Sequence, residues 1–452
     1  MNGVLWAGSI WAVVLVAIWT RDKKRPNSER TLTRENLAIV IALLGTHSIV
    51  GSTDAEEILR DPVALERVLR GFLAGLSILM VAPRLVSRLW GHRTGGHRGL
   101  TALTTYTAVA FISTIYSSAS LVSAAKAVEL FAGLAAVACI AFGGDALNSL
   151  KVTVSLLVLL EGTLLTIAVA GFFLLPGTFA ALLPRPGFIS DLTMGSPYAH
   201  PNALSSMGAL VGAYCLALFF AHKSLGARRL VWLGVVGVGL LGTILSSGRQ
   251  GVVIWIVSAL VLFALQRRRT LIFGIIPIAV FMINTYGAAI WQALLRSRPT
   301  TLGTLTGRTV WWGAALEAWR DHPWTGWGYG VGGRFVALRS IGRGTTSNIH
   351  SGYFEALVGI GVLGVLPLLY ALGRASIWAA RSLRRRLDVH VAILIIPLVL
   401  RTGVAQGFGA WLNFELVLFM CLVAIADRTW IAARDEVRPT VTSALHLVES
   451  AG

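Results

Sequence analysis

The stretch LVWLGVVGVGLLGTILSSGRQGVVIWIVSALVLFALQR, residues 230–267, decides the class of fold. It contains two apolar runs separated by the short polar turn SSGRQG. About 20 helical residues cross a hydrocarbon core of roughly 30 Å, so each run predicts a membrane helix. Similar runs recur along the whole chain, in which 55% of the residues are hydrophobic and 13% are charged. A water-soluble domain cannot build its surface from this composition, so the sequence predicts an integral membrane protein.

The predicted fold is an all-α, polytopic transmembrane helical bundle of about 12–13 membrane helices. We expect residues 1–452 to form a single integral membrane domain, because no repeat or low-complexity tract divides the chain. The first span is expected to be retained, since it lacks a positively charged n-region and a small-residue cleavage site. The apolar spans are 2–20, 36–52, 64–82, 100–119, 121–143, 151–174, 203–221, 230–247, 252–267, 271–292, 351–373, 390–408 and 411–427.

The basic residues predict the orientation, because Lys and Arg in short loops are held on the cytoplasmic side. With the N-terminus outside, the basic loops and the tail at 428–452 are cytoplasmic, while loops 175–202 and 293–350 are extracytoplasmic. Loop 293–350 breaks the pattern, because it holds many arginines against Glu317 and Asp321. We therefore expect it to be the large catalytic loop. Its arginines are Arg296, Arg298, Arg308, Arg320, Arg334, Arg339 and Arg343.

Charge and cysteine usage exclude two other classes of function. The net charge of +18 does not indicate nucleic-acid binding, because topology already accounts for most of the basic residues. The three cysteines lie inside apolar spans without CxxC spacing, so they predict neither a disulfide framework nor a thiolate metal site. Within the spans, Lys126 and Glu129 can neutralise each other, whereas Arg401 has no obvious local partner. Ionisable residues buried in lipid are functional candidates because their burial is costly.

Two polar clusters on the outer side precede helices. In SSGRQG, residues 246–251, Arg249 at a helix end beside Ser247 offers donors to a phosphate oxygen. The alternative is a short hairpin with an interfacial arginine. In PYAHPNALSSMGAL, residues 197–210, His200 and Asn202 stand where a polar loop enters a helix. The alternative for Asn202 is a simple N-cap.

Two further clusters lie in or next to the large loop. In residues 304–333, apolar and aromatic residues recur at helical spacing from Gly307 to Arg320, which predicts an amphipathic helix with Arg308 in its first turn. Its tryptophans are alternatively interfacial anchors, and the glycines that follow permit a close approach to a ligand. In residues 347–369, His350 stands at the mouth of a membrane helix, with Glu355 about a turn and a half deeper. The alternative for His350 is a capping or interfacial role.

Taken together and in this order, four motifs resemble the O-antigen ligase and O-antigen polymerase superfamily. They are HPN at 200–202, SSGRQG at 246–251, GRTVWWGAALEAWRDHPWTGWGYG at 307–330 and NIHSGYFEALVGIGVLG at 348–364. The resemblance covers residues 195–370 and elsewhere rests on hydropathy. It implies a GT-C-like, multi-pass glycosyltransferase of the bacterial inner membrane with its active site on the extracytoplasmic side. Such an enzyme transfers a glycan from undecaprenyl pyrophosphate to a hydroxyl of a glycan or lipid acceptor.

The resemblance also suggests roles for individual residues. The serine-arginine-glycine turn of the family matches Ser247, Arg249 and Gly251, and the arginine before its tryptophan helix matches Arg308. Its histidine matches His350, although Ser351 replaces the asparagine that usually follows. The family's proline-glycine-glycine turn matches Pro323, Gly326 and Gly328.

We expect His350 to be the general base and Arg249 and Arg308 to bind the pyrophosphate, because cations assist the departure of an anionic leaving group. No DxD-like acidic pair occurs in the outer loops, so we expect inverting transfer without a metal or any other cofactor. The remaining substrate-binding candidates are Ser247, Asn202, His200, Arg334, Arg339, Arg401, Glu355 and Tyr329, the last as a ring that stacks on sugar or polyprenyl chain.

Several alternatives stay open at the level of sequence. Ligase and polymerase share the donor and differ in the acceptor, so the motifs do not separate them. A lipid or polysaccharide transporter also has many helices and a few buried charges, although no two-fold repeat of broken helices is evident. A purely structural membrane partner is the third class. Apart from donor and acceptor, membrane lipids are the expected partners, and nucleic acid is not.

Overall fold

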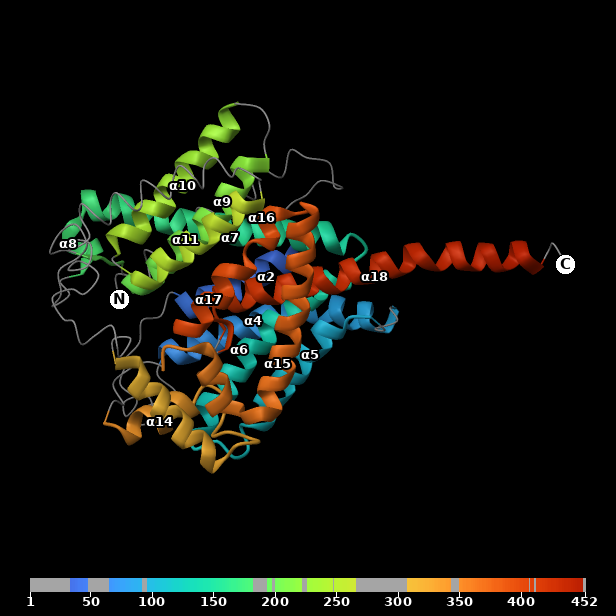
Figure 1. The fold of residues 1–452 in the computed structure, drawn as a ribbon. Helices are drawn as coiled ribbons and strands as arrows, with labels where there is room; N and C mark the ends of the chain where they lie inside the picture. The colour runs from blue at the N-terminus through green and yellow to red at the C-terminus, as the bar shows by residue number, and fades with distance from the viewer. Residues whose placement is uncertain are drawn as a thin grey trace.

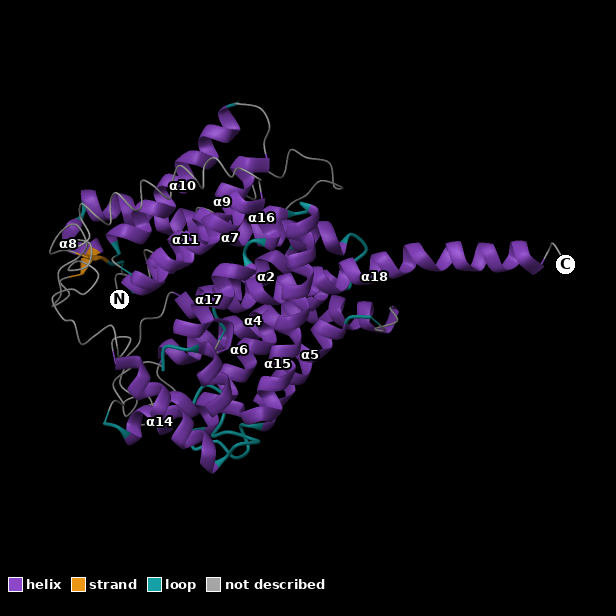
Figure 2. Ribbon diagram, in the orientation of Figure 1, coloured by secondary structure: helices purple, strands orange, loops and turns teal. Residues whose placement is uncertain are grey.

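The computed structural model describes residues 33–47, 65–91, 96–181, 193–196, 200–221, 226–246, 248–265, 307–342, 349–405, 407–409 and 412–449. Nearly all of these residues are helical, as Figure 1 and Figure 2 show. The predicted spans 2–20 and 271–292 lie outside the described residues, as do Ser247 and the loop arginines Arg296, Arg298 and Arg343. Each of the other predicted spans overlaps a described helix.

Eleven of the described helices make up the bundle. They are α2 (Arg34–His47), α4 (Leu65–Gly91), α5 (Arg98–Ile112), α6 (Ser120–Ala141), α7 (Ala146–Leu174), α9 (Pro201–Ala221), α10 (Ala227–Leu245), α11 (Arg249–Leu265), α15 (Gly352–Arg385), α17 (Ile395–Val404) and α18 (Phe414–Glu449). Six of the described helices are long and apolar enough to cross a membrane, namely α4, α6, α7, α9, α15 and α18. The polytopic helical bundle predicted from the sequence is therefore confirmed.

Short elements connect these helices. They are α8 (Pro176–Phe179), α14 (Arg308–Asp321), the π-helix η3 (Gly332–Leu338), α16 (Val389–Ala392), the 3-10 turn η4 (Gly407–Gly409), and the strands β1 (Ala180–Ala181) and β2 (Thr193–Met194). The two strands pair antiparallel in loop 175–202. Helix α14 lies where the aromatic spacing predicts a helix, with Arg308 in its first turn. Ala315 and Ala318 are buried, whereas Val310 and Leu316 of the predicted apolar stripe are exposed.

Helix α18 forms the centre of the bundle. Its first turns, from Phe414 to Asp427, are almost completely buried, and they pack against α5, α6, α7 and α15. Helices α9 and α10 cross closely, because a β-carbon on Gly208 would lie 2.5 Å from the carbonyl oxygen of Gly239. Small residues of this kind let membrane helices approach each other without steric conflict. Beyond the bundle, residues 428–449 continue α18 in a straight line, as Figure 1 shows.

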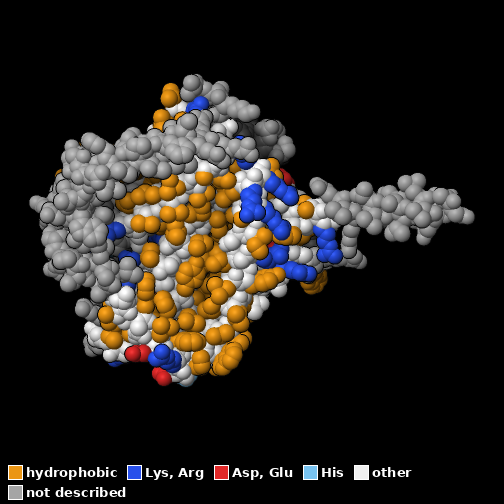
Figure 3. All heavy atoms as spheres, viewed as in Figure 1, with side chains coloured by type: hydrophobic (Ala, Val, Ile, Leu, Met, Phe, Trp, Pro, Cys, Tyr) orange, Lys and Arg blue, Asp and Glu red, His pale blue; other side chains and the backbone are white. Residues whose placement is uncertain are grey.

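The two ends of the bundle differ in charge. At one end, which we call the basic end, α4 ends near Arg88, α5 begins at Arg98 and α15 ends with Arg384 and Arg385. Figure 3 shows Lys and Arg side chains gathered on one flank of a broad apolar surface. The carboxylates at this end are paired, as Arg374 and Asp427 are at 2.8 Å. The opposite end, which we call the loop end, carries α14 and the starts of α9, α11 and α15.

Helix α15 is broken at Gly361, and the glycine-rich loop repairs the break. Gly361 has φ of 61° and ψ of −165°, so the helical hydrogen-bond ladder is interrupted there. The amides of Val362 and Leu363 donate instead to the carbonyls of Pro323 and Trp324, at 3.0 and 3.2 Å. Backbone groups freed inside a membrane helix need such replacement partners, because lipid offers none. The break therefore fixes the large loop to the bundle.

The glycines of this loop approach protein backbone. A β-carbon on Gly326 would lie 2.5 Å from the carbonyl carbon of Gly359, and one on Gly328 would lie 2.3 Å from Ser117 Oγ. The amide of Gly328 donates to the Gly359 carbonyl at 2.8 Å, and Ser113 Oγ accepts from the Tyr329 amide at 2.9 Å. We expected these glycines to permit a close approach to a ligand, but the space is taken by α15 and by the connection between α5 and α6.

Replacing Gly361 by alanine should destabilise the protein by about 2–6 kcal/mol, because this backbone conformation and overpacking each cost about 1–3 kcal/mol. The added β-carbon would lie 2.3 Å from the carbonyl of Trp324. Thermal unfolding in detergent measures the effect. Gly373→Ala is the matched control, because nothing lies within 4 Å of its β-carbon in the same helix. Equal unfolding temperatures for the two variants would contradict the role we give to the break.

Candidate functional site

The candidate residues stand at the starts of four helices that meet at the loop end. His200 precedes α9, Arg249 is the first residue of α11, Arg308 is the first residue of α14, and His350 lies two residues before α15. The first amides of a helix lack intrahelical partners and carry a partial positive charge, so a helix start attracts anions. A group of such starts beside two guanidinium groups is suited to a highly charged anion such as pyrophosphate.

Electrostatic interactions connect these residues although they are distant in sequence. Burial and the positive charge of Arg249 lower the pKa of the Arg308 guanidinium. Burial and the charges of Arg308 and His200 lower the pKa of His350 to about 4. Arg249, Arg308, His200 and His350 therefore form one cluster, which we call the arginine-histidine cluster. The cluster brings together the three catalytic residues predicted from the sequence.

His350 is held in an unusual backbone conformation. Its φ of 55° lies in the left-handed region, which residues other than glycine adopt at a cost. Its ring stacks on Trp311 of α14, with the ring centroids 5.1 Å apart and the planes inclined by 27°. Arg308 lies three residues before Trp311, so both side chains lie on the same side of α14. The helix thus presents a cation and an aromatic ring to the same imidazole.

Tryptophans fasten α14 to the start of α15 and to its own loop. The Nε1–H group of Trp312 donates to the carbonyl of Ile349 at 3.2 Å, and its ring stacks on Phe354 at 5.6 Å. Trp327 donates to the carbonyl of Ala318 at 2.7 Å, and Trp319 donates to Pro323 at 3.0 Å. These three rings are partly buried in an apolar cluster. These contacts indicate that the three tryptophans are packing residues, which hold α14 and the start of α15 together and so position Arg308 and His350.

The starts of α9 and α11 are joined by direct contacts. Ser205 Oγ donates to the Gly248 carbonyl at 2.8 Å, and a β-carbon on Gly251 would lie 2.1 Å from Ser205 Oγ. Gln250 Nε2 donates to the carbonyl of Asn202 at 3.1 Å. Residues 248–251 are therefore closely packed against the start of α9, and this junction carries Arg249 at the start of α11. The short hairpin that we considered as the alternative is therefore present, and it carries Arg249.

His200, and not Asn202, caps α9. The Nδ1 atom of His200 accepts a hydrogen bond from the Asn202 amide at 3.2 Å, and Asn202 lies inside the first turn. The capping role that we considered for Asn202 is therefore wrong, because the helix begins one residue earlier, at Pro201. Proline is favoured there since it has no amide hydrogen that needs a partner. Burial lowers the pKa of His200 as well, which favours its neutral, accepting form.

Other candidates predicted from sequence lie away from the cluster. Arg401, which has no obvious local partner in the sequence, forms an ion pair with Glu415 at the start of another helix, α18. A sequence signal was present, because Glu415 is a lone acid at the beginning of an apolar span. Tyr329 is 1% exposed and packs edge-on against Tyr106 at 6.0 Å. Its buried ring offers no face for a sugar, so the stacking role that we expected for it is also wrong.

The two remaining loop arginines differ in environment. Arg339 is exposed at the end of η3. Arg334 is half-buried within η3 and interacts electrostatically with Glu355 and Lys126. Lys126 pairs with Glu129 at 3.1 Å, as their spacing predicts, and Arg70 joins the same carboxylate at 3.1 Å. These buried charges lie beneath the large loop and form a second polar region within the bundle.

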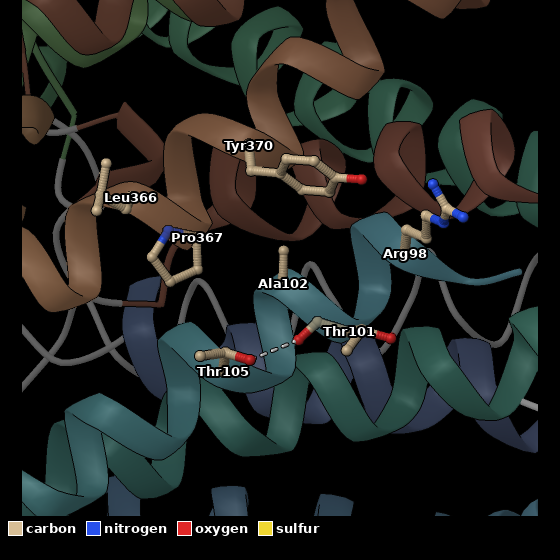
Figure 4. Close-up of a pocket in the computed structure, with 7 residues that line it drawn as sticks. All are labelled: Arg98, Thr101, Ala102, Thr105, Leu366, Pro367 and Tyr370. Carbon is tan, nitrogen blue, oxygen red and sulfur yellow. Dashed lines mark hydrogen bonds between the residues drawn. The ribbon is translucent and has the colours of Figure 1, made fainter. Parts of the chain in front are cut away.

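A groove between α5 and α15 is separate from the cluster. It has a volume of about 610 Å³, and Figure 4 shows its lining, which consists of Arg98, Thr101, Ala102, Thr105, Leu366, Pro367 and Tyr370. None of the predicted site residues lines it. Among the described residues, no group of three His, Cys, Asp or Glu side chains is arranged to hold a metal ion.

Comparison with known families gives one match. A family model described as O-antigen ligase matches residues 235–369, which include Arg249, Arg308 and His350. No curated protein matches the chain. The matched segment therefore contains three members of the arginine-histidine cluster, and His200 lies before it.

Proposed function

We propose that the chain is a membrane glycosyltransferase of the O-antigen ligase superfamily, which the match over residues 235–369 supports. Its donor in this proposal is a glycan linked to undecaprenyl pyrophosphate. The glycan passes to an acceptor hydroxyl at the outer face, with inversion at the anomeric carbon. The observation that carries the proposal is the arginine-histidine cluster. The Arg308 guanidinium acts on the His350 imidazole, and the Arg249 guanidinium acts on Arg308.

The proposed reaction is a displacement at the anomeric carbon. The acceptor oxygen forms a bond to this carbon, and the bond between the carbon and the pyrophosphate oxygen breaks. The electron pair of the broken bond leaves with undecaprenyl pyrophosphate, and the hydroxyl proton passes to His350. Guanidinium groups and helix starts stabilise the charge that develops on the leaving oxygen. No step requires a metal ion.

The cluster also explains how a histidine with a depressed pKa serves as a base. A pKa of about 4 keeps free His350 neutral but makes it a weak base. A pyrophosphate bound to Arg308 offsets the positive charge that depresses this pKa. Binding of the donor therefore raises the basicity of His350 in the complex that reacts.

The charge asymmetry of the bundle supports an extracytoplasmic site. Arg98, Arg384 and Arg385 lie at the basic end, which the preference of Lys and Arg for cytoplasmic loops assigns to the cytoplasm. Helix α15 runs from the start next to His350 to Arg385 at the basic end. The cluster then faces the outer leaflet of the bacterial inner membrane, where a lipid-linked glycan is available.

The test is a transfer assay with purified protein, an undecaprenyl pyrophosphate-linked glycan and candidate acceptors. We expect release of undecaprenyl pyrophosphate together with a glycosylated acceptor, at a rate that EDTA leaves unchanged. A lipid acceptor product would identify a ligase, and elongation of the glycan itself would identify a polymerase. Movement of the lipid-linked glycan across a vesicle membrane without any transfer would contradict the proposal in favour of transport. Loss of activity in EDTA that Mg²⁺ restores would contradict the metal-free mechanism.

A further inference from the structure

The peptide before His350 is held by an unusual set of partners. The Ile349 amide donates to Glu355 Oε1 at 2.7 Å, while the Ile349 carbonyl accepts from Trp312 at 3.2 Å. On the other side of His350, the Gly352 amide donates to the carbonyl of Ala405 at 2.7 Å. His350 and Ser351 lie between these fixed peptides, and His350 has φ of 55°. Such a conformation persists only where the surroundings determine it.

Glu355 is built into the protein in a way that does not suit substrate binding. It is 5% exposed, and its first carboxylate oxygen is used by the Ile349 amide. Its second oxygen lies against η3, where a β-carbon on Gly333 would be only 2.3 Å away. The charge of Arg334, also on η3, acts on the same carboxylate.

We propose that Glu355 is a positioning residue that fixes the left-handed backbone at His350 through the Ile349 amide and so sets the imidazole between Trp311 and Arg308. This inference rests on the proposed function only for its kinetic consequence. The conformational part concerns the chain alone. It replaces the substrate-binding role that we expected for Glu355 from the sequence.

The consequence for His350 follows from its neighbours. Burial, the Arg308 guanidinium on α14 and, when it is protonated, His200 before α9 all lower the pKa of the imidazole. When the Ile349 hydrogen bond is lost, the His350 backbone can relax from its left-handed conformation and the ring becomes more hydrated. Hydration and distance from Arg308 both raise the pKa of the imidazole toward its ordinary value of about 6.5.

The experiment measures carbethoxylation of His350 by diethyl pyrocarbonate, which attacks neutral imidazole, and reads each histidine by mass spectrometry. In the wild-type protein we expect nearly equal rates at pH 5.5 and pH 7.5. In Glu355→Leu we expect the rate at pH 5.5 to fall about tenfold below that at pH 7.5, as a pKa near 6.5 requires. Glu355→Gln keeps an oxygen acceptor, so its ratio of His350 modification rates at the two pH values should stay within about threefold of the wild-type ratio. The matched control variant is Glu317→Leu, because Glu317 is an exposed residue of α14. Modification of the exposed His322 in the same sample serves as the internal reference.

The kinetic readout separates positioning from other roles. Glu355→Leu should lower kcat by about 10²-fold while the KM for the lipid-linked donor changes less than threefold, because misplacing a reacting group costs this much. Should Glu355→Leu fail to fold, Gly333→Ala carries the same measurement, because its β-carbon would displace the Glu355 carboxylate. An unchanged pH dependence of His350 modification in a folded Glu355→Leu protein would overturn the proposal. The modification needs no glycan donor, so it remains informative even if the chain proves not to be a transferase.

Discussion

His350→Asn is expected to lower kcat for glycan transfer by about 10²–10⁴-fold, because a positioned general base contributes this much. Asparagine is the suitable replacement, since it tolerates the left-handed backbone observed at His350 and cannot accept a proton near neutral pH. The KM for the lipid-linked donor should change little, because the pyrophosphate is assigned to Arg249 and Arg308. Initial rates with purified protein at saturating donor measure the effect.

The control for this prediction is His390→Asn, in α16 at the basic end of the bundle. Its ring lies 5.5 Å from Tyr214 and does not belong to the arginine-histidine cluster. The control should retain normal activity and the same unfolding temperature as the wild-type protein. If His350→Asn turned over the donor at a rate near that of His390→Asn, another group would have to take the proton.

The membrane helices were predictable because their signal is local. A run of apolar residues such as 230–247 is recognisable without knowledge of its neighbours, and α10 occupies this region. Helix α14 was predictable for the same reason, since its aromatic residues recur at helical spacing. The residues at which helices begin were harder to predict. His200 caps α9 because Pro201 begins the helix, a difference of one residue that hydropathy does not resolve.

Contacts between distant segments were less predictable. The motifs indicated that Arg249, Arg308 and His350 act together, but hydropathy contains no information on which helix starts meet. The partner of Arg401 is Glu415, which follows a turn that reverses the chain between α17 and α18. The glycines of the large loop looked like ligand contacts because their conformational freedom is visible in sequence. Their actual neighbours include the carbonyls of Val358 and Gly359, next to the break of α15 at Gly361, and the Ser117 side chain.

Arg308→Gln should lower kcat/KM by about 10²–10³-fold, as the loss of one donor to a developing anion does. Arg249→Gln should have an effect of similar size. If both guanidinium groups hold the same pyrophosphate, their effects should not be additive, because they share a partner. The fall in kcat/KM of the double variant should then be about tenfold smaller than the product of the two single falls. Arg320→Gln is the control, since this side chain is exposed in the last turn of α14.

The pH dependence distinguishes the two arginines. Arg308 acts directly on His350, whose pKa of about 4 is lowered by burial and by this charge. Removing the charge raises the pKa toward 6.5, so more of the free enzyme is protonated at mildly acidic pH and the acidic limb of kcat/KM moves to higher pH. Arg249 acts on Arg308, so Arg249→Gln should lower the rate with a much smaller displacement of that limb. An equal shift of the acidic limb in both variants would mean that the imidazole responds to the whole cluster. No shift in either variant would mean that the arginines do not influence the pKa of His350.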